Sequence, residues 1–71
     1  MKMHYDQQVD ALHLSLDEFE VVESEEVKPG IIFDFNAVGE VVGIELLDVK
    51  RRLPSADLTE LKFEVASARR A

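Results

Sequence analysis

Two histidines and one aspartate are the side chains of this sequence best suited to hold a metal ion. The first sixteen residues alternate apolar and polar side chains, which is typical of two half-buried strands. If residues 7–10 form the loop between them, His4 lies opposite His13, and Asp6 shares their face two positions from His4. Imidazole and carboxylate groups are ordinary ligands of divalent transition metals, so these three residues form a candidate metal site. The competing interpretation is a pair of surface histidines that face each other without a ligand.

Asp34 and Glu45 are the next candidates, because two close carboxylates can serve acid–base chemistry. The hairpin register predicted from the sequence places Asp34 opposite Val41 and Glu45 opposite Gly30, so we expect the two carboxylates to lie apart. None of the four serines follows a nucleophile-elbow pattern, and the three glycines form no phosphate-binding loop. We therefore expect no enzymatic activity and no cofactor.

Charge divides the chain into an acidic body and a basic end. Residues 1–48 hold twelve acidic and two basic side chains, a net charge of −10, whereas residues 49–71 hold six basic and three acidic ones, a net charge of +3. An acidic body opposes phosphate binding, so nucleic acid is not an expected partner. We expect the basic clusters at residues 50–52 and 69–70 to be solvated or to neutralise the acidic sheet. The charge favours solubility and attraction to a basic protein.

The N-terminal hairpin has the register that its apolar side chains require. With a loop at residues 7–10, Tyr5 faces Leu12 and Met3 faces Leu14. A slip by one residue would place apolar side chains opposite polar ones, so the pattern predicts this register alone.

The middle of the chain predicts a third strand that starts at Phe19, after a turn at residues 17–18. The charged residues 23–26 are predicted to lie at a sheet edge or a bulge, where charge discourages pairing with other chains. Pro29 and Gly30 fit a type II turn, because glycine accepts positive φ there at low cost.

A second hairpin follows, with strands at residues 31–35 and 42–46 around a loop at residues 36–39. Asparagine at the start and glycine at the end of that loop are typical of a type I turn. This loop length places Phe33 opposite Val42 and Ile31 opposite Ile44.

The C-terminal third is less regular. Residues 57–60 have the spacing of a capping box, which predicts a short helical turn. Residues 61–66 fit either a strand or a helix, since Leu61, Phe63 and Val65 alternate with charged residues while Leu58, Leu61 and Val65 also fit a helical stripe.

We therefore predict one domain over residues 1–71, of the mainly β class (a small α+β fold). It comprises an antiparallel meander of about five strands over residues 1–48, a basic connector over residues 49–56 and a C-terminal segment over residues 57–71. One face of the meander is strongly apolar and carries Met3, Tyr5, Leu12, Leu14, Leu16, Phe19, Val21, Ile31, Phe33, Phe35, Val42, Ile44 and Leu46.

The apolar face predicts self-association. A sheet that is apolar on one face must cover that face, and the C-terminal segment offers few large apolar side chains for the purpose. We expect a homodimer or a higher homo-oligomer that packs sheet on sheet. The alternative is a monomer in which the meander coils into a small barrel.

Several short motifs in a fixed order resemble a family of small bacterial proteins. They are Tyr5-Asp6, Asp10-Ala11-Leu12, Glu25-Glu26, Pro29-Gly30, Asp34, Gly39, Val42-Gly43-Ile44-Glu45 and Asp48. Over residues 1–54 the chain resembles the domain of unknown function 2283 family. The resemblance implies no catalytic residue, and the family's frequent gene neighbours, small toxin-like proteins, imply an antitoxin role. The histidines at positions 4 and 13 depart from the family pattern.

Two functions are therefore expected for different reasons. The first is a non-catalytic protein-interaction module, antitoxin-like in its binding of a basic toxin-like protein. The alternative is a small metal-binding or hydrolytic protein that uses His4, His13 and Asp6. We expect a cytoplasmic location without membrane contact, because no apolar run follows Lys2, no apolar stretch is long enough to span a bilayer, and cysteine is absent.

Overall fold

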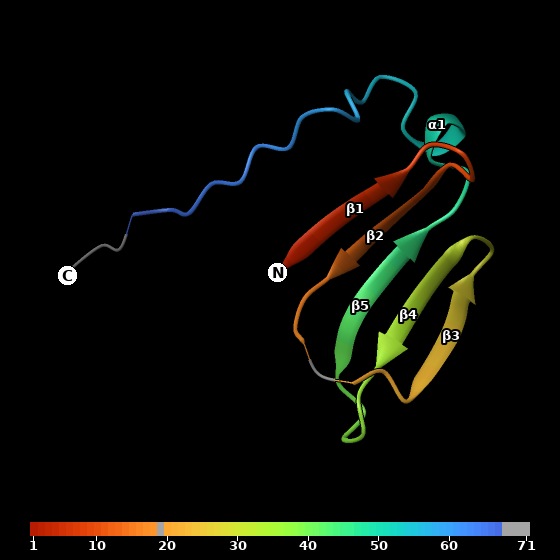
Figure 1. The fold of residues 1–71 in the computed structure, drawn as a ribbon, viewed down its shortest axis with the longest axis vertical. Coiled ribbons are helices and arrows are strands. Elements are labelled where there is room, and N and C mark those ends of the chain that lie inside the picture. The colour runs from red at the N-terminus through yellow and green to blue at the C-terminus, as the bar shows by residue number, and fades with distance from the viewer. Residues whose placement is uncertain (19, 68–71) are drawn as a thin grey trace.

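The computed structural model describes residues 1–18 and 20–67, and these form one open antiparallel sheet with a short helix at one end (Figure 1). The fold class predicted from the sequence, mainly β with about five antiparallel strands, is confirmed. The strands are β1 (Lys2–Asp6), β2 (Ala11–Ser15), β3 (Glu23–Lys28), β4 (Ile31–Phe35) and β5 (Val41–Leu46), and the helix is α1 (Val49–Arg52).

The strand order is β1-β2-β5-β4-β3, so the sheet departs from a simple meander at one place. β5 lies between β2 and β4, and the chain after β2 crosses to the far edge of the sheet before β3 begins (Figure 1). Residues 16–18 and 20–22 lie in this crossing, and the amide nitrogens of Leu16 and Val22 donate to the carbonyl oxygens of Val42 (2.8 Å) and Phe35 (2.9 Å). Three strand spacings of about 4.8 Å are well within the reach of seven residues.

The prediction of a third strand that starts at Phe19 is therefore wrong. Residues 20–22 belong to this crossing, and Phe19 itself lies outside the described residues. The barrel-like alternative is also contradicted, because β1 and β3 are the two edges of an open sheet within the described part of the chain.

The N-terminal hairpin has the predicted register. Tyr5 pairs with Leu12, Met3 with Leu14 and His4 with His13 across β1 and β2. The loop closes at Asp10, which adopts a left-handed conformation with φ of 56°.

The register predicted for the second hairpin is wrong by two residues. Phe33 pairs with Ile44, not with Val42, and Ile31 pairs with Leu46, not with Ile44. One residue of this shift comes from a tighter turn, in which Asn36 and Glu40 pair (3.0 Å from nitrogen to oxygen) around a left-handed Gly39 with φ of 84°. The other comes from a bulge between Asp34 and Phe35 in the pairing with β5.

β3 is the charged edge strand that the acidic pattern indicated. All six of its residues are exposed, and a register shift between Glu26 and Lys28 marks a bulge. Pro29 and Gly30 turn the chain into β4, with Gly30 at φ of 77° as a type II turn requires.

The only helix among the described residues lies in the segment predicted to be a connector, not at residues 57–60, which form a turn. α1 is tied to the sheet by its ends. Asp10 accepts hydrogen bonds from the Val49 amide to its carbonyl oxygen (3.2 Å) and from the Lys50 amide to its carboxylate (3.2 Å). Arg52 donates from Nε to the Leu47 carbonyl oxygen (2.7 Å) and from its terminal guanidinium nitrogen to the Pro29 carbonyl oxygen.

The sheet is a single layer with little fully enclosed core. Among the described hydrophobic residues, only Val42 and Val49 are buried, and the thinnest dimension of the molecule is 19 Å. Residues 61–66, for which the sequence allows a strand or a helix, form neither. This stretch is extended and joins no sheet. Within the described ranges, no helix has the length and apolar character needed to cross a bilayer.

Candidate interaction surface

The polar face of the sheet carries a row of hydrogen-bonded side chains from three strands. The imidazole Nε2 of His13 on β2 lies 3.1 Å from Oδ2 of Asp34 on β4, and the Ser24 hydroxyl on β3 donates to Oδ1 of Asp34 (2.7 Å). The three residue types are those of a hydrolase triad, but here the carboxylate lies between the other two groups. No imidazole contacts the serine, so this arrangement does not activate the hydroxyl as a nucleophile.

Gly43 makes the row sterically feasible. It lies on β5, between the strands that carry His13 and Asp34, and pairs with Ser15 on one side and Asp34 on the other. A Cβ at this position would lie 2.7 Å from the Asp34 carboxylate and 3.2 Å from His13 Nε2. The absence of a side chain therefore lets the imidazole reach across β5 to the carboxylate.

The predicted metal site is only partly assembled. His4 and His13 are cross-strand partners as expected, and both line a shallow depression on the polar face with Lys2 and Ser15. Asp6 instead accepts a hydrogen bond from the Gln8 amide (2.9 Å) in the hairpin loop. Within residues 1–18 and 20–67, no three His, Cys, Asp or Glu side chains gather as a metal-binding cluster.

The observed strand register places Asp34 and Glu45 opposite other residues than the sequence predicts. Asp34 lies opposite Gly43, not Val41, and Glu45 lies opposite Ile32 and His13, not Gly30. The two carboxylates are diagonal neighbours on the polar face instead of direct partners. The carboxylate of Asp34 accepts from the Ser24 hydroxyl and is paired with His13, which gives it a bracing role in the sheet.

Tyr5 and Asp10 form a second polar contact, at the end of the sheet that holds α1. The Tyr5 hydroxyl donates to the Asp10 carboxylate (2.7 Å). This hydrogen bond, together with desolvation and the negative charge of Asp10, raises the pKa of Tyr5 to about 12. The same hydrogen bond lowers the pKa of Asp10 below its ordinary value, with further help from the Lys50 amide. The pair locks the β1–β2 loop to the start of α1.

The opposite face of the sheet is apolar across four strands. One cross-strand row runs Met3, Leu14, Ile44 and Phe33, and a second row runs Tyr5, Leu12, Leu46 and Ile31. Phe35 extends this face, with its ring edge-to-face against Phe33 at a centroid distance of 6.5 Å. We call this set the apolar face. None of its nine side chains is fully buried in the single chain.

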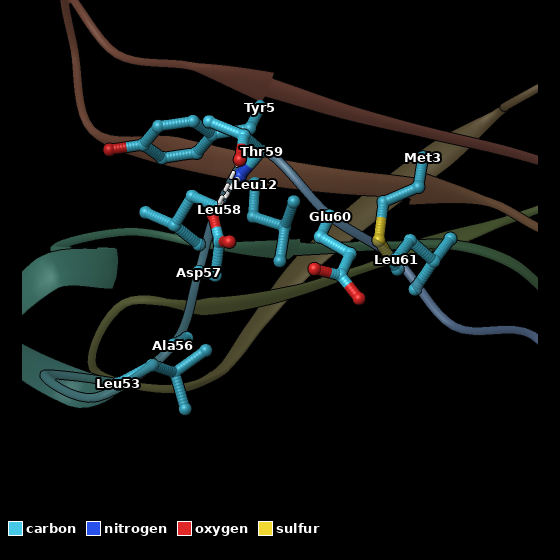
Figure 2. Close-up of a pocket in the computed structure, with 10 residues that line it drawn as sticks. All are labelled: Met3, Tyr5, Leu12, Leu53, Ala56, Asp57, Leu58, Thr59, Glu60 and Leu61. Atoms are coloured by element: carbon cyan, nitrogen blue, oxygen red, sulfur yellow. Dashed lines mark hydrogen bonds between the residues drawn. The ribbon is translucent and has the colours of Figure 1, made fainter.

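A groove runs along the β1 side of the apolar face. Met3, Tyr5 and Leu12 form its wall, and Leu58 and Leu61 of the C-terminal segment enter it (Figure 2). A second, adjoining groove is lined by Met1, Met3, Leu14, Leu61 and Phe63. The C-terminal segment thus covers the β1–β2 margin of the apolar face, and neither groove includes a residue of β4 or β5.

Sequence reasoning missed three residues with structural roles. Asp10 and Arg52 join segments that are distant along the chain, so no local pattern signals them. Gly43 lies inside a strand, and an isolated strand glycine is a known sign of a bulge or a close approach, which is the signal that could have identified it.

Comparison with known proteins gives one match. The model of a protein family described as being of unknown function, DUF2283, matches residues 2–50 of the 71-residue chain. No curated protein and no solved structure matches the chain. The matched region ends in α1, so it includes the whole sheet and excludes the C-terminal segment.

Proposed function

We propose a function for this chain from the premise that it belongs to the DUF2283 family, whose description assigns no activity. The chain is a non-catalytic protein-interaction module that binds through the apolar face. The observation that carries this proposal is the open state of that face. Phe33, Ile44 and their neighbours on β4 and β5 are only partly shielded, and nothing in the described part of the chain forms a second layer over them. Apolar side chains that stay partly exposed are favourable to bury, and a continuous face of them usually marks a contact surface.

The polar face supports a non-catalytic role. The candidate catalytic groups there are engaged with one another, since Asp34 accepts from Ser24 and pairs with His13. A general base must reach a substrate proton, whereas these contacts hold the Asp34 carboxylate, whose side chain is 15% exposed, within the row. The row braces β2, β3 and β4 across the sheet.

The charge of the body favours a basic partner. Residues 17–26 carry Asp17, Glu18, Glu20, Glu23, Glu25 and Glu26, all of them exposed at the β3 edge or in the crossing that leads to it. This negative field would speed encounter with a basic, toxin-like protein, as expected of an antitoxin-like inhibitor in the cytoplasm. The apolar face would then supply the contact that persists after encounter.

Co-expression with the product of the adjacent gene tests this role. We expect a complex on affinity purification and rescue of growth when that product is toxic. Because steering by charge is screened by salt, the association rate should fall as the salt concentration rises. A variant with Glu20→Gln and Glu23→Gln should associate more slowly, whereas the control Lys28→Gln should not. Absence of both a complex and growth rescue would rule out the antitoxin role.

Metal binding is the second candidate, and the cross-strand pairing of His4 with His13 is the observation that favours it. Two imidazoles on neighbouring strands can share one divalent ion, although Asp6 does not join them. Titration with zinc, followed by calorimetry, should show binding that His4→Ala abolishes. A chain that takes up no zinc at neutral pH would eliminate this candidate.

A further inference from the structure

The C-terminal arm, residues 57–67, leaves the body of the molecule beside β1. It starts in a turn in which the Thr59 amide and hydroxyl donate to Oδ1 of Asp57 (2.9 and 2.6 Å). From there it runs outward, away from the sheet (Figure 1). Exposure rises along its course, from a half-buried Leu58 to 62% for Leu61, 70% for Phe63 and 79% for Val65.

The arm has the pattern of a strand without a strand to pair with. Leu61, Phe63 and Val65 alternate with Lys62 and Glu64, so in an extended chain the three apolar side chains point to one side. After Glu60, no backbone hydrogen bond ties the arm to the rest of the described chain. An extended segment with one apolar side is unfavourable in water and gains from a surface that accepts it.

The same chain offers such a surface. The arm reaches the apolar face only at its β1–β2 margin, where Leu58 and Leu61 lie in the groove with Met3 (Figure 2). Phe33 and Ile44 on the central strands stay outside that groove. Every copy therefore has an uncovered part of the apolar face, around Phe33 and Ile44. Every copy also has an arm whose apolar side chains lack a surface to pack on.

The exposed area indicates how much surface is available for a partner. The chain exposes 6044 Å², whereas a compact monomer of 8.0 kDa is expected to expose roughly 4,450 Å². The excess of about 1,600 Å² per chain amounts to about 3,200 Å² for a pair, which lies in the range of obligate homodimers. A second copy can bury this excess symmetrically, because each copy is both donor and acceptor.

We propose that two copies of this chain exchange C-terminal arms, so that Leu61, Phe63 and Val65 of one copy pack on the apolar face of the other, around Phe33 and Ile44. Arm exchange rests on the proposed interaction role and names the first partner that binds to the apolar face, which is the arm of a second copy. The arm then completes a core that neither copy builds alone.

The decisive test compares two arm variants by sedimentation equilibrium. The first, Leu61→Ser/Phe63→Ser/Val65→Ser, removes the apolar side of the arm, and the matched control, Lys62→Ser/Glu64→Ser, changes the other side. Leu61, Phe63 and Val65 are largely exposed in the single chain, so the first variant removes little internal packing beyond the contacts of Leu61 and Phe63 with the β1–β2 margin. We expect the first variant to weaken dimerisation by about 100-fold or more and the control to leave it within about threefold. A dimer that both variants form equally well would overturn arm exchange, while the apolar face would remain a candidate contact surface.

Because a chain that loses its partner can also lose its fold, a second measurement uses the unaltered sequence. Carbon-13-labelled and unlabelled chains are unfolded together, refolded as mixed dimers and studied by isotope-filtered NMR. Arm exchange predicts intermolecular contacts between the Phe63 ring and the Ile44 methyl groups. Contacts of Phe63 within one chain only, or a monomeric wild type, would overturn the exchange. Capture of a basic partner by such a monomer would still support the proposed function.

Discussion

Substitution of Gly43 by alanine tests whether the polar row braces the sheet. The new Cβ would lie 2.7 Å from Oδ2 and 3.2 Å from Cβ of Asp34, and 3.2 Å from Nε2 of His13. Asp34 has little freedom to move away, because one oxygen is 3.1 Å from His13 and the other accepts from Ser24 at 2.7 Å. Relief of the clash must therefore break hydrogen bonds or displace β5 from β4.

The expected cost follows from these contacts. Overpacking of a tight site costs roughly 1–3 kcal/mol, and a lost hydrogen bond adds about 1 kcal/mol. Alanine has a lower conformational entropy than glycine in the unfolded chain, which offsets roughly 0.5–1 kcal/mol of this loss in the free energy of unfolding. We expect a net loss of about 2 kcal/mol in the free energy of unfolding, which lowers the urea midpoint by about 1–2 M in a protein of this size.

Urea unfolding followed by circular dichroism measures this loss, with all variants at one protein concentration because self-association would shift the midpoint. In an Asp34→Ala background, Gly43→Ala should cost less than about 0.5 kcal/mol, since the clashing oxygen is gone. Gly39→Ala is the matched control. Its φ of 84° and open surroundings predict a cost of about 1 kcal/mol that is the same in both backgrounds. An unchanged midpoint for Gly43→Ala, or an equal loss with and without Asp34, would show that the polar row does not brace the sheet.

Two further predictions concern the contacts that hold α1 to the sheet. Because Tyr5 is the only tyrosine, its ionisation can be followed by ultraviolet absorbance, and its pKa should fall from about 12 towards 10 in an Asp10→Asn variant. The raised pKa of Tyr5 contributes stability that is complete below pH 10 and is lost as the pH rises towards 12. The lowered pKa of Asp10 contributes stability that is lost as the pH falls below about 3.8. Arg52→Lys should cost about 1–2 kcal/mol by thermal or urea unfolding, because a lysine ammonium cannot reproduce the geometry of the guanidinium bonds to Leu47 and Pro29. A loss below about 0.3 kcal/mol would mean that the arginine does not tie the helix to the β3–β4 turn.

The sequence predicted the faces of the strands better than their partners. The β1–β2 register was correct because a four-residue loop is short and a slip by one residue would expose Tyr5 and Leu12. The β4–β5 register was wrong by two residues, and a shift of two keeps each side chain on its face. Phe33 meets an apolar partner in either register, so the alternation pattern cannot distinguish them.

The features that the sequence did not predict depend on contacts between distant residues. β5 pairs with β2 only because the chain crosses the end of the sheet after β2, and the local sequence pattern of that crossing resembles a turn and a strand. Asp48 occupies the N-cap of α1, a position that aspartate favours, but its side chain makes no capping hydrogen bond. Asp10, forty residues before Lys50, holds the start of the helix instead, and no local pattern signals that contact. Leu61, Phe63 and Val65 have a clear strand pattern, yet no strand among residues 1–18 and 20–67 pairs with them.

We propose the apolar face as a contact surface and a second copy of the chain as its first occupant. The mass of the unmodified chain in solution tests it most directly. Sedimentation equilibrium between about 1 and 100 µM spans the affinities expected of an obligate pair. Dimerisation through the apolar face predicts a species of about 16 kDa, twice the chain mass of 8.0 kDa, over most of that range. A folded species of 8.0 kDa at the highest concentrations would contradict it.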